Sequence, residues 1–228
     1  MFYRAGHLVL KPLTHALWRP RITGTEHVPP TGGVILASNH FSFIDSFTIP
    51  LAAPRQVHFL AKDDYWGGSG PVAAARRGFM TSMGAIPVNR RSSRAAQESL
   101  DAALEVLRAG GAFGIYPEGT RSRDGRLYRG RTGVAFLALT AGVPIVPVAL
   151  SGTADVQPIG SRLPRLARLG VAFGPAIHVT ERYQGVPQGK ARRQVTDEVM
   201  AAIAALSGQE FAGDYNELPS DSGPAIAT

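Results

Sequence analysis

Short continuous apolar runs recur along the chain and are separated by longer stretches that mix apolar and polar positions. Runs of this kind are typical of strands that are buried on both faces of a sheet. Val171–Phe173 and Ile177–Val179 are shorter, and we expect them to be edge strands. The longer runs predict strands at Val34–Ala37, Val57–Ala61, Ala85–Val88, Ala112–Tyr116 and Ile145–Leu150.

The stretches between these runs carry apolar residues three and four positions apart, which predicts helices. The clearest helix is Ser93–Ala109, and a glycine pair ends it. A helix from Ser42 should end at Ile49, because the residue before Pro50 disfavours the helical conformation. Further helices are expected at Val72–Phe79, Gly133–Ala141 and Arg192–Leu206. Alternating strands and helices predict one α/β layered domain with a largely parallel or mixed central sheet flanked by helices.

The N-terminal stretch reads as a separate amphipathic helix over residues 2–18, which Pro12 can kink. Up to Arg21 it holds four lysines and arginines and no acid, as helices in a membrane interface do. The alternative is a helix that packs on the core of its own domain. We therefore predict a membrane-interface segment over 1–21, a main domain over 22–212 and a flexible tail over 213–228.

Composition narrows the choice of partners. Lys and Arg number 24 against 17 Asp and Glu, a net charge of +7, which suits anionic lipid or a phosphorylated substrate. Basic runs interleaved with aromatic residues are missing, so we expect no nucleic-acid partner. The chain has no cysteine, which excludes disulfides and thiolate nucleophiles. No apolar run is as long as a membrane span and no signal peptide is evident, so we expect neither an integral nor a secreted protein.

The first motif whose side chains could take part in catalysis follows the strand at Val34 and runs from Asn39 to Asp45. His40 is suited to proton transfer near neutral pH, and a carboxylate such as Asp45 can fix its tautomer and ring. Two other interpretations stay open here. Ser42 and Asp45 match a capping box, and His40 could be a hydrogen-bonded structural histidine.

Three further motifs lie at strand ends. Gly84–Arg91 brings two arginines to the end of a strand, and arginine grips phosphate with a planar fork of donors. Tyr116–Arg123, which contains the segment Pro117–Arg121, combines a glycine that permits close backbone approach with donors for an anion. Val143–Pro147 places two prolines around a strand start, which predicts an edge strand or a place where no backbone donor is needed. That motif would suit the wall of an acyl channel, and plain packing explains it equally well.

Other catalytic classes lack their motifs. The sequence has no Gly-x-Ser-x-Gly elbow, and the segment Gly185–Lys190 has the wrong spacing for a Walker phosphate loop. It also has no His-Glu-x-x-His or comparable cluster of metal ligands. We therefore expect no metal and no cofactor.

Together, and in this order, the four motifs resemble the glycerolipid (lysophospholipid) acyltransferase family, whose best-known members are 1-acyl-glycerol-3-phosphate acyltransferases. The resemblance covers roughly residues 22–180. It implies that His40 is the base and Asp45 its partner. It also implies a substrate-binding set made of Asn39, Lys62, Arg90, Glu118, Gly119, Thr120 and Arg121.

The resemblance further implies transfer of a fatty acyl group from acyl-CoA or acyl-ACP to the free hydroxyl of 1-acyl-glycerol-3-phosphate. From the N-terminal segment, we expect the protein at the cytoplasmic face of the cell membrane as a peripheral or monotopic protein. Tyr116 departs from a common phenylalanine, and Asp63-Asp64 stand where a glutamate is more usual. Two alternatives remain: another lysophospholipid as acceptor, or a catalytically idle lipid-binding protein. The sequence leaves open the donor, the acyl-chain length and the oligomeric state.

Overall fold

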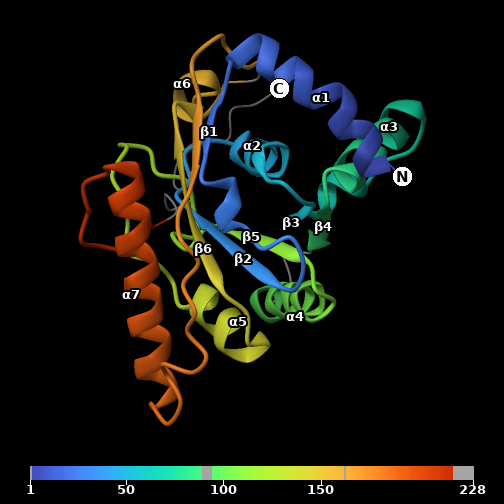
Figure 1. The fold of residues 1–228 in the computed structure, drawn as a ribbon. Coiled ribbons are helices and arrows are strands. Elements are labelled where there is room, and N and C mark those ends of the chain that lie inside the picture. The colour runs from blue at the N-terminus through green and yellow to red at the C-terminus, as the bar shows by residue number, and fades with distance from the viewer. Residues whose placement is uncertain (1, 89–93, 162, 218–228) are drawn as a thin grey trace.

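One seven-stranded sheet forms the centre of the computed structural model (Figure 1). The structure describes residues 2–88, 94–161 and 163–217, the side chains of residues 2–9 excepted. The strands lie in the order β1-β7-β6-β2-β5-β3-β4. All neighbours pair in parallel except β6 and β7, which are antiparallel. The strands are β1 (Arg21–Thr23), β2 (Val34–Ser38), β3 (Val57–Lys62), β4 (Ala85–Val88), β5 (Ala112–Ile115), β6 (Ile145–Ser151) and β7 (Gly170–Phe173).

Helices cover both faces of this sheet (Figure 1). The helices α4 (Ala95–Arg108), α5 (Gly133–Ala141) and α7 (Gln188–Ser207) pack on one face, and α2 (Asp45–Ala52) packs on the other. The remaining helical elements are α1 (Phe2–Trp18), η1 (Thr25–His27), η2 (Asp63–Trp66), α3 (Pro71–Ser82) and α6 (Thr153–Val156). The predicted α/β layered fold with a mixed central sheet is confirmed.

The central strand β2 shows why apolar runs form this sheet. Val34 and Leu36 point to the layer that contains α2, whereas Ile35 and Ala37 point to the layer of α4, α5 and α7. All four side chains are fully buried. A strand covered on both faces needs apolar residues at every position, so the run is continuous and not alternating.

Two prolines lie where the sequence predicted element boundaries. The helix expected to end at Ile49 is wrong at both ends, because α2 begins at Asp45 and continues through Pro50 to Ala52. Pro50 removes only one helical hydrogen bond, and burial of its ring and of Ala52 favours the extra turn. The edge position expected around Pro147 is also wrong, because β6 lies between β2 and β7.

The ladder around Pro147 explains how an interior strand tolerates a proline. The backbone N–H of Gly174 donates to the Pro147 carbonyl at 2.8 Å, so this rung of the β6–β7 pairing uses the carbonyl alone. The site is thus one where no backbone donor is needed, the second option that the sequence left open. The strand expected at Ile177–Val179 reduces to a single bridge between Ile177 and Ile145.

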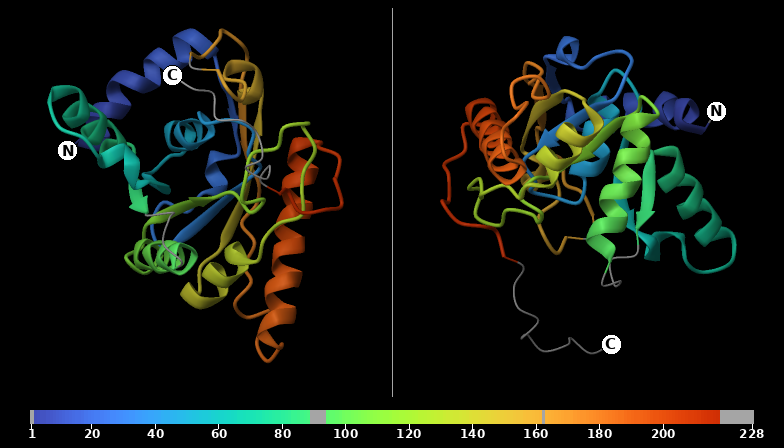
Figure 2. Two further views of the ribbon diagram at one scale, coloured as in Figure 1. Left: turned by 180° about the vertical axis from the view of Figure 1, so that it is seen from behind. Right: turned by 90° about the horizontal axis from the view of Figure 1, so that it is seen from below.

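The N-terminal helix α1 lies across the α2 side of the molecule, and its first turns lie beside α3 (Figure 2). It is a continuous helix with Pro12 inside it. Within the described residues, no helix is both long and apolar enough to cross a membrane.

Candidate active site

The first and third motifs meet at one edge of the sheet. β2 and β5 are parallel neighbours, so the turns that follow them leave the sheet side by side. His40 lies in the turn after β2, and Pro117–Arg121 follows β5. The topology therefore brings together two segments that are about 80 residues apart in the sequence.

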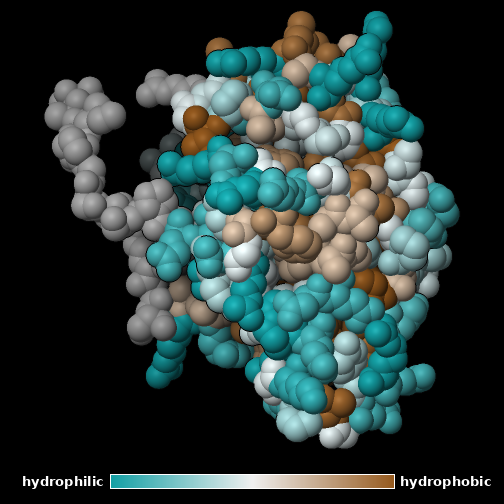
Figure 3. All heavy atoms as spheres, turned by 90° about the vertical axis from the view of Figure 1, so that its left-hand side faces the viewer, coloured by the Kyte–Doolittle hydropathy of each residue, from teal (hydrophilic) through white to brown (hydrophobic). Residues whose placement is uncertain are grey.

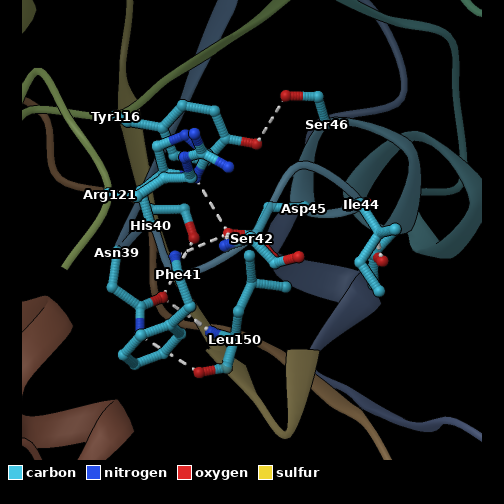
Figure 4. Close-up of polar contacts among 12 residues, drawn as sticks. Asn39, His40, Phe41, Ser42, Ile44, Asp45, Ser46, Tyr116, Arg121 and Leu150 are labelled. Atoms are coloured by element: carbon cyan, nitrogen blue, oxygen red, sulfur yellow. Dashed lines mark hydrogen bonds and ion pairs between the residues drawn. The ribbon is translucent and has the colours of Figure 1, made fainter. Parts of the chain in front are cut away.

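His40 and Asp45 form the central contact of this edge (Figure 4). The His40 Nδ1 lies 2.9 Å from Asp45 Oδ2, and the Asp45 side chain is fully buried while that of His40 is 16% exposed. A buried carboxylate accepts the Nδ1 proton, which leaves a lone pair on Nε2 at the opposite side of the ring. Nε2 has no protein partner among the described residues.

Asp45 also organises the backbone of the turn. The same Oδ2 accepts the N–H groups of Phe41 at 2.7 Å and Ser42 at 2.8 Å. One half of the expected capping box is thus present. The other half is absent, because the Asp45 N–H donates to the Ser42 backbone carbonyl and not to the Ser42 hydroxyl, which itself donates to the Gln157 carbonyl. Asp45 therefore shapes the turn and orients His40 at once.

The third motif holds the main chain of His40 from both sides. Glu118 Oε1 accepts the His40 N–H at 3.2 Å, and the Ser122 N–H donates to the His40 carbonyl at 2.7 Å. These two bonds fix the position of the histidine relative to the loop that carries Arg121.

Glu118 is fully buried and faces backbone groups. Its Oε2 accepts the Tyr128 N–H at 2.9 Å, so the carboxylate bridges the histidine turn and the later part of its own loop. Burial raises the pKa of Glu118 to about 7, against the opposing effect of the two amide donors. The side chain lines neither of the cavities beside His40.

Asn39 is likewise buried, and its side-chain amide hydrogen-bonds to other protein groups. Its Oδ1 accepts the Leu150 N–H at 2.8 Å, and its Nδ2 donates to the Leu150 carbonyl at 3.1 Å (Figure 4). Nδ2 also donates to Gln209 Oε1 at 2.6 Å. The amide thus ties the end of β2 to the end of β6 and to the segment after α7.

Tyr116 covers one face of the His40 ring. The two rings stack with centroids 3.8 Å apart and an angle of 9° between their planes. The Tyr116 hydroxyl lies 3.1 Å from the Ser46 hydroxyl (Figure 4). Burial raises the pKa of Tyr116 well above its ordinary value, and the nearby Asp45 raises it further. The phenol therefore stays neutral and restricts the rotation of the imidazole.

Two cavities adjoin at His40. The first has a volume of about 240 Å³ and carries the cations Lys62 and Arg121 on its wall. The second has a volume of about 250 Å³ and is mainly apolar. Its lining includes Phe59, Leu60, Leu100, Ala103, Phe113 and Leu137.

The other members of the expected substrate set lie at different distances from this site. Gly119 lines the second cavity with a φ of 82°, a conformation that favours glycine. Thr120 is half-buried and lines neither cavity. Arg90 lies outside the described residues. The Val143–Pro147 motif also lines neither cavity, and its residues Val143, Ile145 and Val146 pack in the core.

The sequence missed several residues that support the site. Ser46 lines both cavities, and Ser122 and Gln209 hold the neighbouring segments in place. Ser122 lies within the third motif, which extends from Tyr116 to Arg123, but it was given no role there. Gln209 lies about 170 residues from Asn39, and no local pattern connects them.

Comparison with known proteins assigns the chain to a family. Residues 19–151 match the family model described as Acyltransferase. A chloroplastic 1-acyl-sn-glycerol-3-phosphate acyltransferase from Brassica napus is 32% identical over 148 residues, which are 64% of this chain and 41% of the relative. A 1-acyl-sn-glycerol-3-phosphate acyltransferase from Bacillus subtilis is 25% identical over 83% of this chain and 88% of the relative. The chain thus spans about two fifths of the chloroplastic relative and most of the bacterial one.

A solved structure shares the fold. The crystal structure of the 1-acyl-sn-glycerophosphate (LPA) acyltransferase PlsC from Thermotoga maritima superposes with a TM-score of 0.68 at 22% identity. The similarity covers 90% of this chain and 79% of that chain. The matched family segment contains β2, the His40 turn, β5 and the Pro117–Arg121 loop. The chain therefore belongs to the acyltransferase family.

Proposed function

We propose that this chain transfers a fatty acyl group to the free hydroxyl of 1-acyl-sn-glycerol-3-phosphate, with acyl-CoA or acyl-ACP as the donor. One observation carries the proposal. His40, oriented by Asp45, lies where a cavity with two cations adjoins an apolar cavity. A phosphate and an acyl chain have the matching chemistry. The names of the relatives from Brassica napus and Bacillus subtilis support the same acceptor.

The reaction follows from the tautomer that Asp45 selects. His40 Nε2 takes the proton of the lipid hydroxyl, and the oxygen attacks the thioester carbonyl carbon. The tetrahedral intermediate then collapses with cleavage of the carbon–sulfur bond. The thiolate leaves with the proton that His40 returns, so the base is regenerated. Asp45 stabilises the imidazolium while it exists.

The two cations are suited to hold the acceptor. Arg121 can grip the phosphate with two parallel donors, and Lys62 adds a point charge on the same cavity wall. Neither side chain has an acidic partner among the described residues. Their role is positioning, because a phosphate held there presents the neighbouring hydroxyl to His40. We propose that Arg90 contributes to the same grip.

Asn39 and Glu118 belong to the site as positioning residues in this proposal. Each is buried and hydrogen-bonded to main-chain groups beside His40. Their side chains hold the histidine turn and do not contact the acceptor. Substituting either one should disturb the reaction through the geometry of His40.

The same proposal places the protein at the cytoplasmic face of a membrane as a peripheral protein, where its lipid substrate resides. The exposed residues of α1 include Leu13 and Leu17 together with Lys11, a pattern suited to an anionic interface. The net charge of +7 supports this placement.

Release of free thiol from acyl-CoA in the presence of lysophosphatidic acid tests the proposal. We expect His40→Ala to lower the rate by about 10²–10⁴-fold. The matched control is His178→Ala, because His178 is exposed and lies away from both cavities. The activity is absent if the wild type releases no thiol with any lysophospholipid offered. The proposed base is wrong if His40→Ala keeps full activity.

A further inference from the structure

The loop between α6 and β7 exposes large apolar side chains. Leu163 is 77% exposed and Leu166 is 76% exposed, although leucine is among the residues most often buried. Ile159 in the same loop is also exposed. Exposure of several large apolar side chains in one loop indicates a contact with another apolar phase.

Hydrogen bonds hold the described part of this loop in a defined shape. The Ser161 N–H donates to the Pro158 carbonyl at 2.9 Å, and the Ser161 hydroxyl donates to the Leu163 carbonyl at 2.8 Å. The Arg165 N–H donates to the Val156 carbonyl at 2.6 Å. The leucines are therefore presented outward by an ordered backbone, and the hydrophobic cost of their exposure persists in the free protein.

Charge in the loop has one sign. The sequence places Arg162, Arg165 and Arg168 among the leucines and has no acidic residue between Asp155 and Glu181. Arg165 and Arg168 are exposed and have no acidic partner among the described residues. Apolar and cationic side chains in alternation match the boundary between anionic headgroups and acyl chains.

The loop adjoins the last turn of α1. The Trp18 indole N–H donates to the Arg165 carbonyl at 2.8 Å, and the views from the front and from behind both place the end of α1 beside the loop (Figures 1 and 2). On α1, Leu13 is 50% exposed and Leu17 is 43% exposed. Hydrophobic and hydrophilic atoms project together at this end of the molecule (Figure 3). The two elements therefore offer one continuous surface.

We propose that the α6–β7 loop, in its described residues 158–161 and 163–168, is a second membrane-contacting element that inserts its leucines into an anionic bilayer beside α1. This inference rests on the proposed membrane location of the enzyme. The continuity with α1 favours a bilayer over an acidic protein partner. So does the outward position of two leucines, because a lipid surface accepts apolar side chains without a matched pocket.

The base of the loop connects to the catalytic turn. The Ser42 hydroxyl donates to the Gln157 carbonyl at 2.6 Å, and Gln157 directly precedes the loop. Insertion of the loop therefore fixes the height and orientation of the His40 turn relative to the lipid surface. Two contacts, α1 and the loop, define a docking plane better than one.

Because the chain has no cysteine, a single introduced cysteine can carry a polarity-sensitive fluorophore. The test uses the full chain labelled at Leu166→Cys, at Leu13→Cys, or at Glu105→Cys as a control on exposed α4. Vesicles of phosphatidylcholine, with or without phosphatidylglycerol, are added, and emission and quenching by lipid-borne quenchers are measured. We expect blue-shifted, quenched emission at positions 166 and 13 with anionic vesicles, and none at position 105.

The possible outcomes separate the two proposals. Insertion at position 13 without insertion at 166 overturns the loop inference and leaves the membrane location standing. A label that stays in water at both positions overturns both. A label at 166 that responds to acyl carrier protein and not to vesicles assigns the loop to an acidic protein and also overturns the inference.

A second variant tests the energetic contribution of the loop. Leu163→Ser/Leu166→Ser should weaken vesicle binding by about tenfold or more, because two apolar anchors are lost. Turnover of a monomeric, water-soluble lysophosphatidate should stay unchanged, which shows that the domain is folded. Equal vesicle binding by the variant and the wild type would refute the inference.

Discussion

At the scale of single residues, the site depends on carboxylates that face the main chain. One oxygen of Asp45 accepts His40 Nδ1 and two backbone N–H groups, so a single side chain sets both the tautomer and the turn. Glu118 likewise holds the main chain, because one of its oxygens accepts the His40 N–H and the other accepts the Tyr128 N–H. The base is thus held through its main chain as well as its ring.

Burial of Glu118 predicts an unusual pH dependence of stability. Its pKa is raised to about 7 by burial, so the folded protein binds this proton more tightly than the unfolded chain does. The stabilising contribution is fully present below the unfolded pKa and is lost as the pH rises to about 7. Relative to Glu118→Gln, which cannot titrate, the wild type should lose up to about 3 kcal/mol between about pH 5 and about pH 8.

Urea unfolding at these two pH values measures the difference. Glu105→Gln, a substitution of an exposed glutamate on α4, is the matched control and should follow the wild type. If Glu118→Gln follows the same pH dependence as the wild type, then Glu118 does not titrate in this range.

Residue roles could be predicted from the sequence only where local spacing decides them. His40 and Asp45 lie in one turn, so their contact was expected and is present. Asn39 and Glu118 were expected among the substrate ligands. In the structure, both side chains accept hydrogen bonds from backbone N–H groups. Their partners come from β6 and from a residue ten positions later in the loop, and only the folded chain brings these together.

At the scale of elements, apolar runs located the long strands because burial on both faces leaves a continuous signal. The strand β1 was not predicted, because Arg21–Thr23 has one half-buried residue between two exposed ones and so forms no apolar run. The order of the strands in the sheet could not be predicted from the sequence either, because it depends on which runs pair across crossovers. Pro50 misled, because tertiary packing outweighed its local preference, whereas Pro147 meets the second option that its motif left open, a place where no backbone donor is needed.

The segment after α7 is an element that the family match does not reach. It runs beside the loop that carries Arg121: Leu127 N–H donates to the Glu210 carbonyl, and Arg129 N–H donates to the Asp214 carbonyl. The Asn216 amide donates to the carbonyl of Arg121 itself at 3.2 Å. Residues 208–217 thus brace the loop from outside.

Truncation after Ser207 should therefore loosen the grip on the acceptor. We expect KM for lysophosphatidic acid to rise about tenfold, with a smaller fall in kcat, because the loop loses its preorganised position. Truncation after Glu217 is the matched control and should leave both constants unchanged. An unchanged KM after the longer truncation would show that the loop needs no brace.

At the scale of the whole molecule, charge and shape act together. The net charge of +7 attracts the protein to an anionic surface, and each cation near that surface contributes about 1 kcal/mol. Salt screens this attraction over distances beyond a Debye length, while apolar insertion is insensitive to it. The two contributions can therefore be separated by salt.

Deletion of residues 1–18 removes Leu13 and Leu17 together with Lys11 from the docking surface. In sedimentation with anionic vesicles, the deleted protein should bind more weakly than the wild type at every salt concentration. From about 0.05 M to about 0.5 M salt, the wild type should lose part of its binding and keep the part due to apolar insertion. The deleted protein, with fewer apolar anchors, should lose nearly all of its binding over the same range. If its sedimentation equals that of the wild type throughout, α1 does not anchor the protein, and the main domain must bind the vesicles through its cations and its α6–β7 loop.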